Sequence, residues 1–346
     1  MFKKLIIALA LGAGATVAAQ ASANVTIYGV VDTGMKMVDT GAQKVSSASD
    51  GAFETSRLGF IGTEDLGSGS FAEFQLESQL NPSLGSLGST TVAANETFNR
   101  EAWVGLRSNT WGALRVGRSD VTNTQNVDFF AGRFKNFTTN AVNGTNPELG
   151  VDQKNVVRYT TPTIRGLYAE IGYRSGNATT ATTNAGGDEH GIFVRYRTGK
   201  LDLMGGLHQQ QATASAGSRS FGAVGASYDF GFIHVGTSYT AGDVDNTSGK
   251  KNTATQLSAS FPVRPDLNLY TLYSITENGA YNNANKGTGY TFGVSKHLSK
   301  RTTLYGAYSL VYNEANSRMV FSRQGETPTQ GGLNTSALTA GISHRF

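Results

Sequence analysis

The sequence predicts an all-β fold, a 16-stranded antiparallel transmembrane β-barrel. Three observations lead to this prediction. Segments of about ten residues, long enough to cross a bilayer as a tilted strand, alternate apolar and polar side chains along most of the chain. The breaks between these segments are alternately short and long. No segment shows the apolar stripe of an amphipathic helix over several turns.

The first 23 residues have the features of a secretory signal peptide. Two lysines precede an apolar run, and Ala-Ser-Ala at residues 21–23 matches a small-residue cleavage site. We therefore expect residues 1–23 to be a cleaved leader and residues 24–346 to form one barrel domain. After the leader no run of about 18 apolar residues occurs, so the sequence predicts no helical membrane span.

Sixteen segments have the alternation of a strand, from "VTIYGVVDTGMKMVD" near the start to "ALTAGISHRF" at the end. Successive side chains of a strand point to opposite faces, so each segment has an apolar and a polar face. In "TLYGAYSLVYN", for example, Leu304, Tyr308 and Tyr312 share one side. A barrel of this size is wide enough to hold water, so the polar faces are expected to line a channel.

The breaks between segments fall into two groups. The tight breaks are rich in Gly, Pro and Asp and contain "GSGS", "TGK", "DFG", "PVRPD" and "SKR". The long breaks are predicted at residues 40–55, 81–97, 120–154, 176–189 and 313–336. Short periplasmic turns, long extracellular loops and an even number of strands are typical of an outer-membrane barrel.

The chain ends inside its last predicted strand. Leu338, Ala340, Ile342, His344 and Phe346 fall on one face of that strand. A closed barrel satisfies every backbone group in lipid and leaves no open edge. We therefore expect the last strand to pair with the first.

Composition argues against several other classes of function. The chain has no cysteine, which rules out disulfides, thiolate metal sites and cysteine nucleophiles. Removing Lys3 and Lys4 with the leader lowers the basic residues from 29 to 27 against 25 acidic ones, and a formal charge of +2 does not favour nucleic acid as a partner. Glycine-rich stretches such as "GTGYTFG" are not followed by a helix, as a nucleotide-binding loop would be, so no cofactor is expected.

Several stretches carry a family resemblance: "NVTIYGVVDTG", "SRLGFIGTEDLGSG", "NREAWVGLRSNTWGALRVGR", "NVVRYTTP" and the terminal Phe346. Together they resemble the Gram-negative general diffusion porins, nearest to the trimeric 16-stranded beta-proteobacterial type. The resemblance implies a homotrimer in the cell outer membrane, in contact with lipid and lipopolysaccharide. It also implies a water-filled channel for passive diffusion of small hydrophilic solutes and ions. Early-strand glycines, at positions 29, 34, 59 and 105, would help close contact between subunits.

The resemblance also implies roles for individual residues. Family members carry arginines on the barrel wall that face a third loop folded into the lumen, and the matching positions are Arg57, Arg100 and Arg158. The third long break is the candidate for that loop, with Glu148 and Asp152 as the acidic residues opposite the arginines. The terminal Phe346 is expected to be part of the signal read by the outer-membrane assembly machinery.

Side-chain alternation supports part of this constriction independently. Arg57 has the parity opposite Leu58 and Phe60, and Glu77 has the parity opposite Phe74 and Leu76. These apolar residues are expected to face lipid, so both charged side chains should point into the lumen. Arg100 is placed there on the assumption that Trp103 and Gly105 face outward. An arginine facing lipid at mid-depth would cost about 2–4 kcal/mol. The prediction is a constriction of opposed charges with a mild preference for anions.

Two other functions stay open on the sequence alone. A substrate-specific channel for a sugar or an organic acid would need an aromatic ladder along the pore. The alternation of side chains along each strand does not establish such a ladder. An outer-membrane hydrolase would need a Ser/His or Asp/His arrangement at one end of the barrel. The five histidines are spread over five segments, and only His190 begins a strand beside the long loops, next to Asp188 and Glu189. A channel rather than an enzyme is therefore expected.

Overall fold

The structure is a computed structural model that describes residues 24–88, 96–127, 152–176, 187–212, 217–243, 251–278, 285–320 and 330–346. The predicted leader, residues 1–23, lies outside the described residues. Within the described ranges, no helix is both long enough and apolar enough to cross a bilayer.

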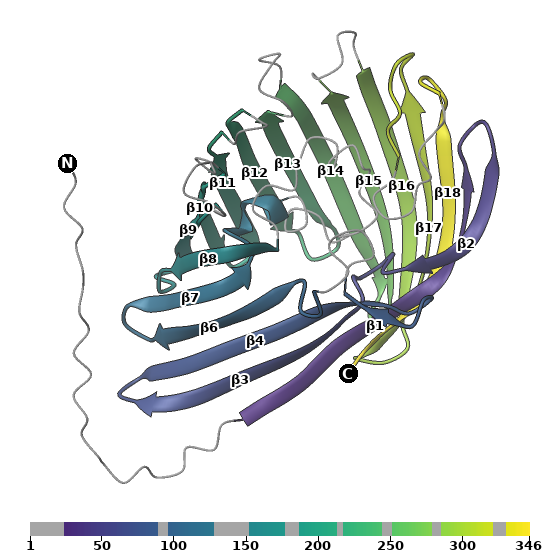
Figure 1. The fold of residues 1–346 in the computed structure, drawn as a ribbon. Coiled ribbons are helices and arrows are strands. Elements are labelled where there is room, and N and C mark those ends of the chain that lie inside the picture. Colours follow the sequence, from purple (N-terminus) through teal and green to yellow (C-terminus); the bar gives the residue numbers. More distant parts are fainter. Residues whose placement is uncertain are drawn as a thin grey trace.

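One antiparallel sheet closes on itself to form a barrel (Figure 1). Its first strands are β1 (Asn24–Asp39), β2 (Lys44–Asp50), β3 (Arg57–Gly67), β4 (Ser70–Asn81), β6 (Glu101–Ser108), β7 (Gly112–Ser119), β8 (Gln153–Thr160) and β9 (Leu167–Arg174). The next are β10 (Glu189–Thr198), β11 (Leu201–Gln210), β12 (Arg219–Asp229), β13 (His234–Asp243) and β14 (Lys251–Arg264). The last are β15 (Leu267–Asn278), β16 (Asn285–His297), β17 (Thr302–Asn313) and β18 (Thr335–Arg345).

Two of these segments share one position in the barrel. The first half of β1 pairs with β3 and its second half pairs with β2, so β2 and β3 together form one interrupted strand. A further short strand, β5 (Ser86–Leu87), pairs with the end of β4 in a separate small sheet. The barrel formed by the described residues therefore has sixteen strands, which confirms the predicted fold class.

The first and last strands close the ring, as predicted. β18 pairs with β1 from Val30 opposite Arg345 to Asp39 opposite Ser336. One residue further on, Gly29 and Phe346 exchange two backbone hydrogen bonds of 3.2 Å. The Phe346 ring lies over Gly29, where a Cβ would come within 2.5 Å of it.

The two faces of the barrel follow the predicted alternation. Ile27, Leu207 and Phe292 are among the large apolar side chains exposed on the outer face. Residues directly opposite in an antiparallel pair point to the same face, so Ile27 and its partner Phe60 both face outward. The inner face carries polar and charged groups, as a water-filled lumen requires.

The turns agree with prediction at one end of the barrel and depart from it once at the other. Short connections lie at residues 68–69, 199–200, 230–233, 265–266 and 298–301, where the tight breaks were predicted. The long first loop predicted at residues 40–55 is wrong, because the strand β2 occupies Lys44–Asp50 of that range after a turn at residues 40–43. The β2 sequence "KVSSASD" has small polar residues on both faces, so the alternation that marks a strand is missing.

Residues 51–56, which interrupt the second barrel strand, fold against the inner wall. Phe53 stacks on Tyr305 of β17 with ring centroids 5.2 Å apart, and Ala52 is buried beside the same ring. The Glu54 backbone N–H donates to the buried carboxylate of Asp32 at 2.8 Å. This segment therefore occupies part of the lumen, on the opposite wall from the third loop described below.

Candidate functional site

Glu77 of β4 is the centre of a charged network on the inner wall. Its carboxylate accepts hydrogen bonds from Arg100 Nε at 2.5 Å and from the Tyr28 hydroxyl at 2.8 Å. Arg57 Nε lies 3.8 Å from the same carboxylate, and Arg57 Nη2 donates to Glu54 at 2.9 Å. Arg57 and Arg100, which the sequence assigns to the constriction together with Glu77, thus both lie against the Glu77 carboxylate.

The alternation of side chains along β6 did not correctly predict how Arg100 comes to point into this network. Val104 is an exposed outward side chain of β6, and its neighbour Trp103 is 5% exposed and faces inward. The assumption that Trp103 and Gly105 face outward is therefore wrong. Arg100 precedes the strand, and its backbone N–H donates to the Glu77 carbonyl at 3.2 Å, which turns its side chain into the barrel.

A second pair of arginines lies on the neighbouring strands. Arg115 of β7 stands directly opposite Arg158 of β8, and Arg158 is buried. The Arg115 guanidinium lies 4.2 Å from the Trp103 ring centroid, a cation–π contact. Arg158 Nη1 donates to the Asp120 carbonyl at 3.3 Å. Within the described part of the chain neither guanidinium has a carboxylate oxygen at ion-pair distance, so the two positive charges are not directly neutralised.

Acidic residues at the root of the third loop lie close to these arginines. The Asp152 backbone N–H donates to Asp120 Oδ1 at 2.9 Å, which joins the two ends of the loop. Burial, reinforced by the charge of Asp120, raises the pKa of Asp152 to about 7, while the charge of Arg100 acts in the opposite direction. The second predicted acid, Glu148, lies outside the described residues.

Sequence reasoning missed two acids of this cluster, Asp120 and Glu101. Glu101 is the residue of β6 directly opposite Glu77, so both carboxylates share the inner face. Placing Trp103 inward would have identified Glu101, because residues 101 and 103 have the same parity. Asp120 has no such signal, since it follows β7 and its orientation depends on the fold of the loop.

The described beginning of the third loop lies inside the barrel, as expected. It forms the short 3-10 helix η1 (Asn123–Asn126), capped by the Thr122 side chain. Val127, directly after it, is buried against Phe193 of β10 and Phe221 of β12. The loop therefore crosses from the arginine side of the lumen to the inner wall of β10–β12.

Other inward arginines are paired with acids. Arg195 and Arg197 of β10 both contact Asp202 of β11, with N–O distances of 2.6 and 2.7 Å. Arg174 of β9 pairs with Glu189. These arginines are thus directly paired with carboxylates, in contrast to Arg115 and Arg158.

Neither His190 nor His208 forms an accessible catalytic arrangement with the described residues. His190 lies on the outer face and packs on the Tyr173 ring, with centroids 5.2 Å apart. Glu189 instead contacts His208 Nε2 at 2.9 Å, and both side chains are almost completely buried. Neither group of this pair can reach a solute in the channel.

The early glycines give little support to a subunit interface. Gly59 lies under the Tyr28 ring, Gly105 lies beside Arg115, and Gly34 shares their inward parity. Gly29 faces outward but is covered by the Phe346 ring. The expectation that these residues pack against a neighbouring subunit is therefore wrong for the three inward glycines, and for Gly29 it stays a prediction.

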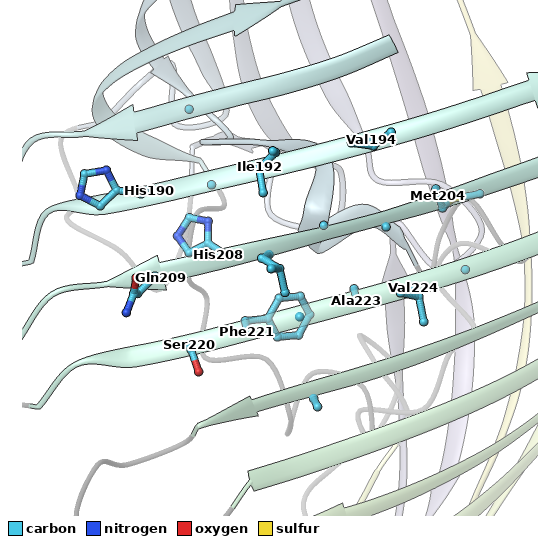
Figure 2. Close-up of a pocket in the computed structure, with 18 of the residues that line it drawn as sticks. His190, Ile192, Val194, Met204, His208, Gln209, Ser220, Phe221, Ala223 and Val224 are labelled. Atoms are coloured by element: carbon cyan, nitrogen blue, oxygen red, sulfur yellow. The ribbon is translucent and has the colours of Figure 1, made fainter. Parts of the chain in front are cut away.

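A hollow of about 1190 Å³ lies on the lipid-facing side of β9–β14, away from the constriction (Figure 2). Apolar side chains such as Ile192, Leu207 and Val224 form its walls. His190 and Gln209 lie toward one end of their strands, as Figure 2 shows. The lining includes His190, His208 and Lys251 but none of the arginines or acids of the constriction.

Comparisons with known proteins agree with this architecture. Residues 6–316 match the family model described as Gram-negative porin. Outer membrane porin protein 32 of Delftia acidovorans is 32% identical over 366 residues, which cover 99% of this chain and 100% of that protein. An outer membrane porin protein of Bordetella pertussis is 28% identical over 404 residues, with coverage of 99% and 100%.

Solved structures give the same result. An anion-selective porin from Comamonas acidovorans has a TM-score of 0.80 to this chain at 27% identity, over 94% of this chain and 100% of that one. The relatives that share this sixteen-stranded architecture are thus channels rather than enzymes. The chain belongs to the Gram-negative porin family and is a diffusion channel of the outer membrane.

Proposed function

We propose that this porin passes small hydrophilic solutes and ions with a mild preference for anions, and that Arg57, Arg100 and Arg158 form its filter. The observation that supports this most directly is the Arg115–Arg158 pair, two adjacent guanidinium groups with no carboxylate at ion-pair distance in the described residues. Arg57 and Arg100 share Glu77, so they add less net charge.

The physical basis of the preference is local potential rather than total charge. Charged groups on low-dielectric walls focus the field into a narrow water column, so a few fixed guanidinium groups raise the local concentration of anions. Glu77, Asp152 and, in our proposal, Glu148 oppose this field. Because the two signs nearly balance, the preference is mild.

The family supports further features of the proposal. The Comamonas relative is described as anion-selective, and a Vibrio cholerae OmpT structure with 16% identity and a TM-score of 0.66 is described as a trimer form. We infer that this chain is also a homotrimer, surrounded by lipid and lipopolysaccharide. Cleavage of residues 1–23 and recognition of Phe346 by the assembly machinery belong to the same proposal.

A substrate-specific channel for a sugar or an organic acid is less well supported. Sugar channels need aromatic faces exposed along the pore. The inward aromatic side chains Trp103, Phe193, Phe221 and Tyr305 are at most 5% exposed. Three further inward rings are half-buried and are engaged with neighbours: Tyr28 donates to Glu77, Tyr270 is hydrogen-bonded to Ser295, and Tyr168 packs on Phe193. This arrangement gives little support to a continuous aromatic ladder in the described lumen.

The test is the reversal potential of purified, heat-modifiable protein in a planar bilayer across a potassium chloride gradient. We expect open channels. Their reversal potential should have the sign that results when chloride permeates faster than potassium. A channel that is cation-selective at neutral pH would overturn the proposed filter. Current that one sugar or organic acid blocks in a saturable way would favour the substrate-specific alternative.

A further inference from the structure

We propose that β9, β10 and β11 carry a seat for the third loop, and that Gly172, Gly191, Gly206 and Glu170 are positioning residues for the constriction. The inference rests on the proposed function as a diffusion channel and names the residues that fix its narrowest part. These residues act through the loop, because they contact the loop rather than the path of a solute.

The first observation is a slot made by three inward glycines on neighbouring strands. Gly172 of β9 stands directly opposite Gly191 of β10, and Gly206 lies on the inner face of β11. A Cβ added at these positions would collide with residues of the third loop, in order Val121, Thr122 and Thr124. At Gly172 the loop backbone lies on the strand at a distance that only glycine permits, and at Gly191 and Gly206 threonine side chains of the loop fill the space that a Cβ would take.

The second observation is a pair of hydrogen bonds from Glu170, which lies two residues before Gly172 on the same face of β9. One carboxylate oxygen accepts from the Asn123 backbone N–H at 2.9 Å and the other from the Asn123 side-chain amide at 2.7 Å. Glu170 is 4% exposed. A carboxylate this deeply buried is tolerated only when it is hydrogen-bonded, so the contact fixes the position of η1.

Two further contacts hold the end of the seated segment. The Thr124 hydroxyl donates to the Ile192 carbonyl of β10 at 3.1 Å. Val127 is fully buried among Phe193, Met204 and other apolar residues of the inner wall. The segment from Val121 to Val127 is thus held by steric fit, by hydrogen bonds and by apolar packing, each from a different residue.

The seat also determines where the charges of the constriction lie. Asp120 directly precedes the seated segment, accepts a hydrogen bond from the Asp152 backbone and lies near Arg158. A displacement of Val121 would therefore move both carboxylates relative to the arginines. Bore and selectivity are expected to change together when the seat is disturbed.

The first test is Gly172→Ala, because an added Cβ there meets Val121 and no atom of the barrel wall among its three nearest neighbours. The matched control is Gly306→Ala, where the nearest atoms lie 3.7 and 3.9 Å away. Both variants should keep heat-modifiable migration. We expect single-channel currents of Gly172→Ala to show a changed main level, sublevels or excess noise, and those of Gly306→Ala to match the parent.

The second test removes the hydrogen bonds instead of adding bulk. Glu170→Ala should produce current changes of the same kind as Gly172→Ala. In addition, the double variant Thr122→Cys/Gly191→Cys should form a disulfide across the seat, because a Cβ at residue 191 lies 2.9 Å from Oγ1 of Thr122 and the chain has no other cysteine. This test does not depend on either single variant folding.

The outcomes separate this inference from the proposed function. If the parent protein forms no channels, the proposed function fails. If the parent conducts but Gly172→Ala and Glu170→Ala have parental current levels, noise and reversal potential, the seat does not position the constriction. Failure of the cysteine pair to join under oxidising conditions would likewise contradict the seat.

Discussion

Neutralising the arginines of the constriction should shift the channel toward cations. The variant is Arg57→Gln/Arg100→Gln/Arg158→Gln. It removes three positive charges and leaves Glu77 without the two guanidinium groups that contact it at 2.5 and 3.8 Å. Asp120 also loses the hydrogen bond that Arg158 donates to its carbonyl.

The size of the effect follows from Coulomb's law. An ion passing about 8 Å from one charge in water gains or loses about 0.5 kcal/mol, so three charges amount to about 1.5 kcal/mol before screening. At about 0.1 M salt, with a Debye length of about 10 Å, roughly half of this remains. The permeability of anions should fall and that of cations should rise by about threefold each. The ratio of the two permeabilities should therefore change by up to about tenfold.

The assay is the reversal potential in a planar bilayer, measured with low and high salt. A matched control neutralises three arginines next to or within the short turns, Arg165→Gln/Arg264→Gln/Arg301→Gln, which changes the net charge by the same amount. The constriction variant should shift the potential more than the control, and the difference should shrink as salt rises. Equal shifts in the two variants, or parental selectivity in the constriction variant, would refute the reasoning.

Three further results are expected. Because Asp152 has a pKa raised to about 7, lowering the pH from 8 to 6 should protonate it, remove one negative charge and strengthen the anion preference. Asp152→Asn should make this change in reversal potential smaller. Deleting Phe346 should impair assembly in cells, measured as barrel recovered in the outer membrane. The refolded barrel should lose only on the order of 1–3 kcal/mol of burial, and normal insertion would reduce Phe346 to an anchor. Unboiled protein should migrate in detergent gels as a compact or trimeric species, and a single unfolded band from inserted protein would contradict the closed barrel.

The number of strands and the orientation of most of them could be predicted because the lipid-facing side of each strand has to carry apolar residues. In β17, Leu304, Tyr308 and Tyr312 face outward as their spacing indicates, and each is exposed by 41% or more. The same rule failed at β2, whose small polar residues leave no face to select. It failed again at Trp103, because it assumes a polar lumen and cannot foresee an aromatic ring covered by Arg115.

The constriction was predictable only in part. Arg57 and Glu77 lie on strands, so parity determines their direction. Arg100, Asp120 and Asp152 lie outside strands, where the backbone conformation sets the direction of the side chain; Asp152 has a left-handed φ of 48°. Contacts such as Glu170 with Asn123 join residues 47 apart in the sequence and have no local signal.

The pairing of β1 with β18 has a consequence for the order in which the protein folds. Val30 meets Arg345, 315 positions later, so the last ladder to form joins the two most distant parts of the chain. Bringing such ends together costs about 5 kcal/mol of loop entropy if nothing else has formed, but very little once the intervening hairpins are assembled. Hairpins joined by tight turns should therefore form early and ring closure late. Until then β1 and the most recently added strand both present unpaired backbone groups, so we expect insertion of this chain to need a partner that covers two open edges.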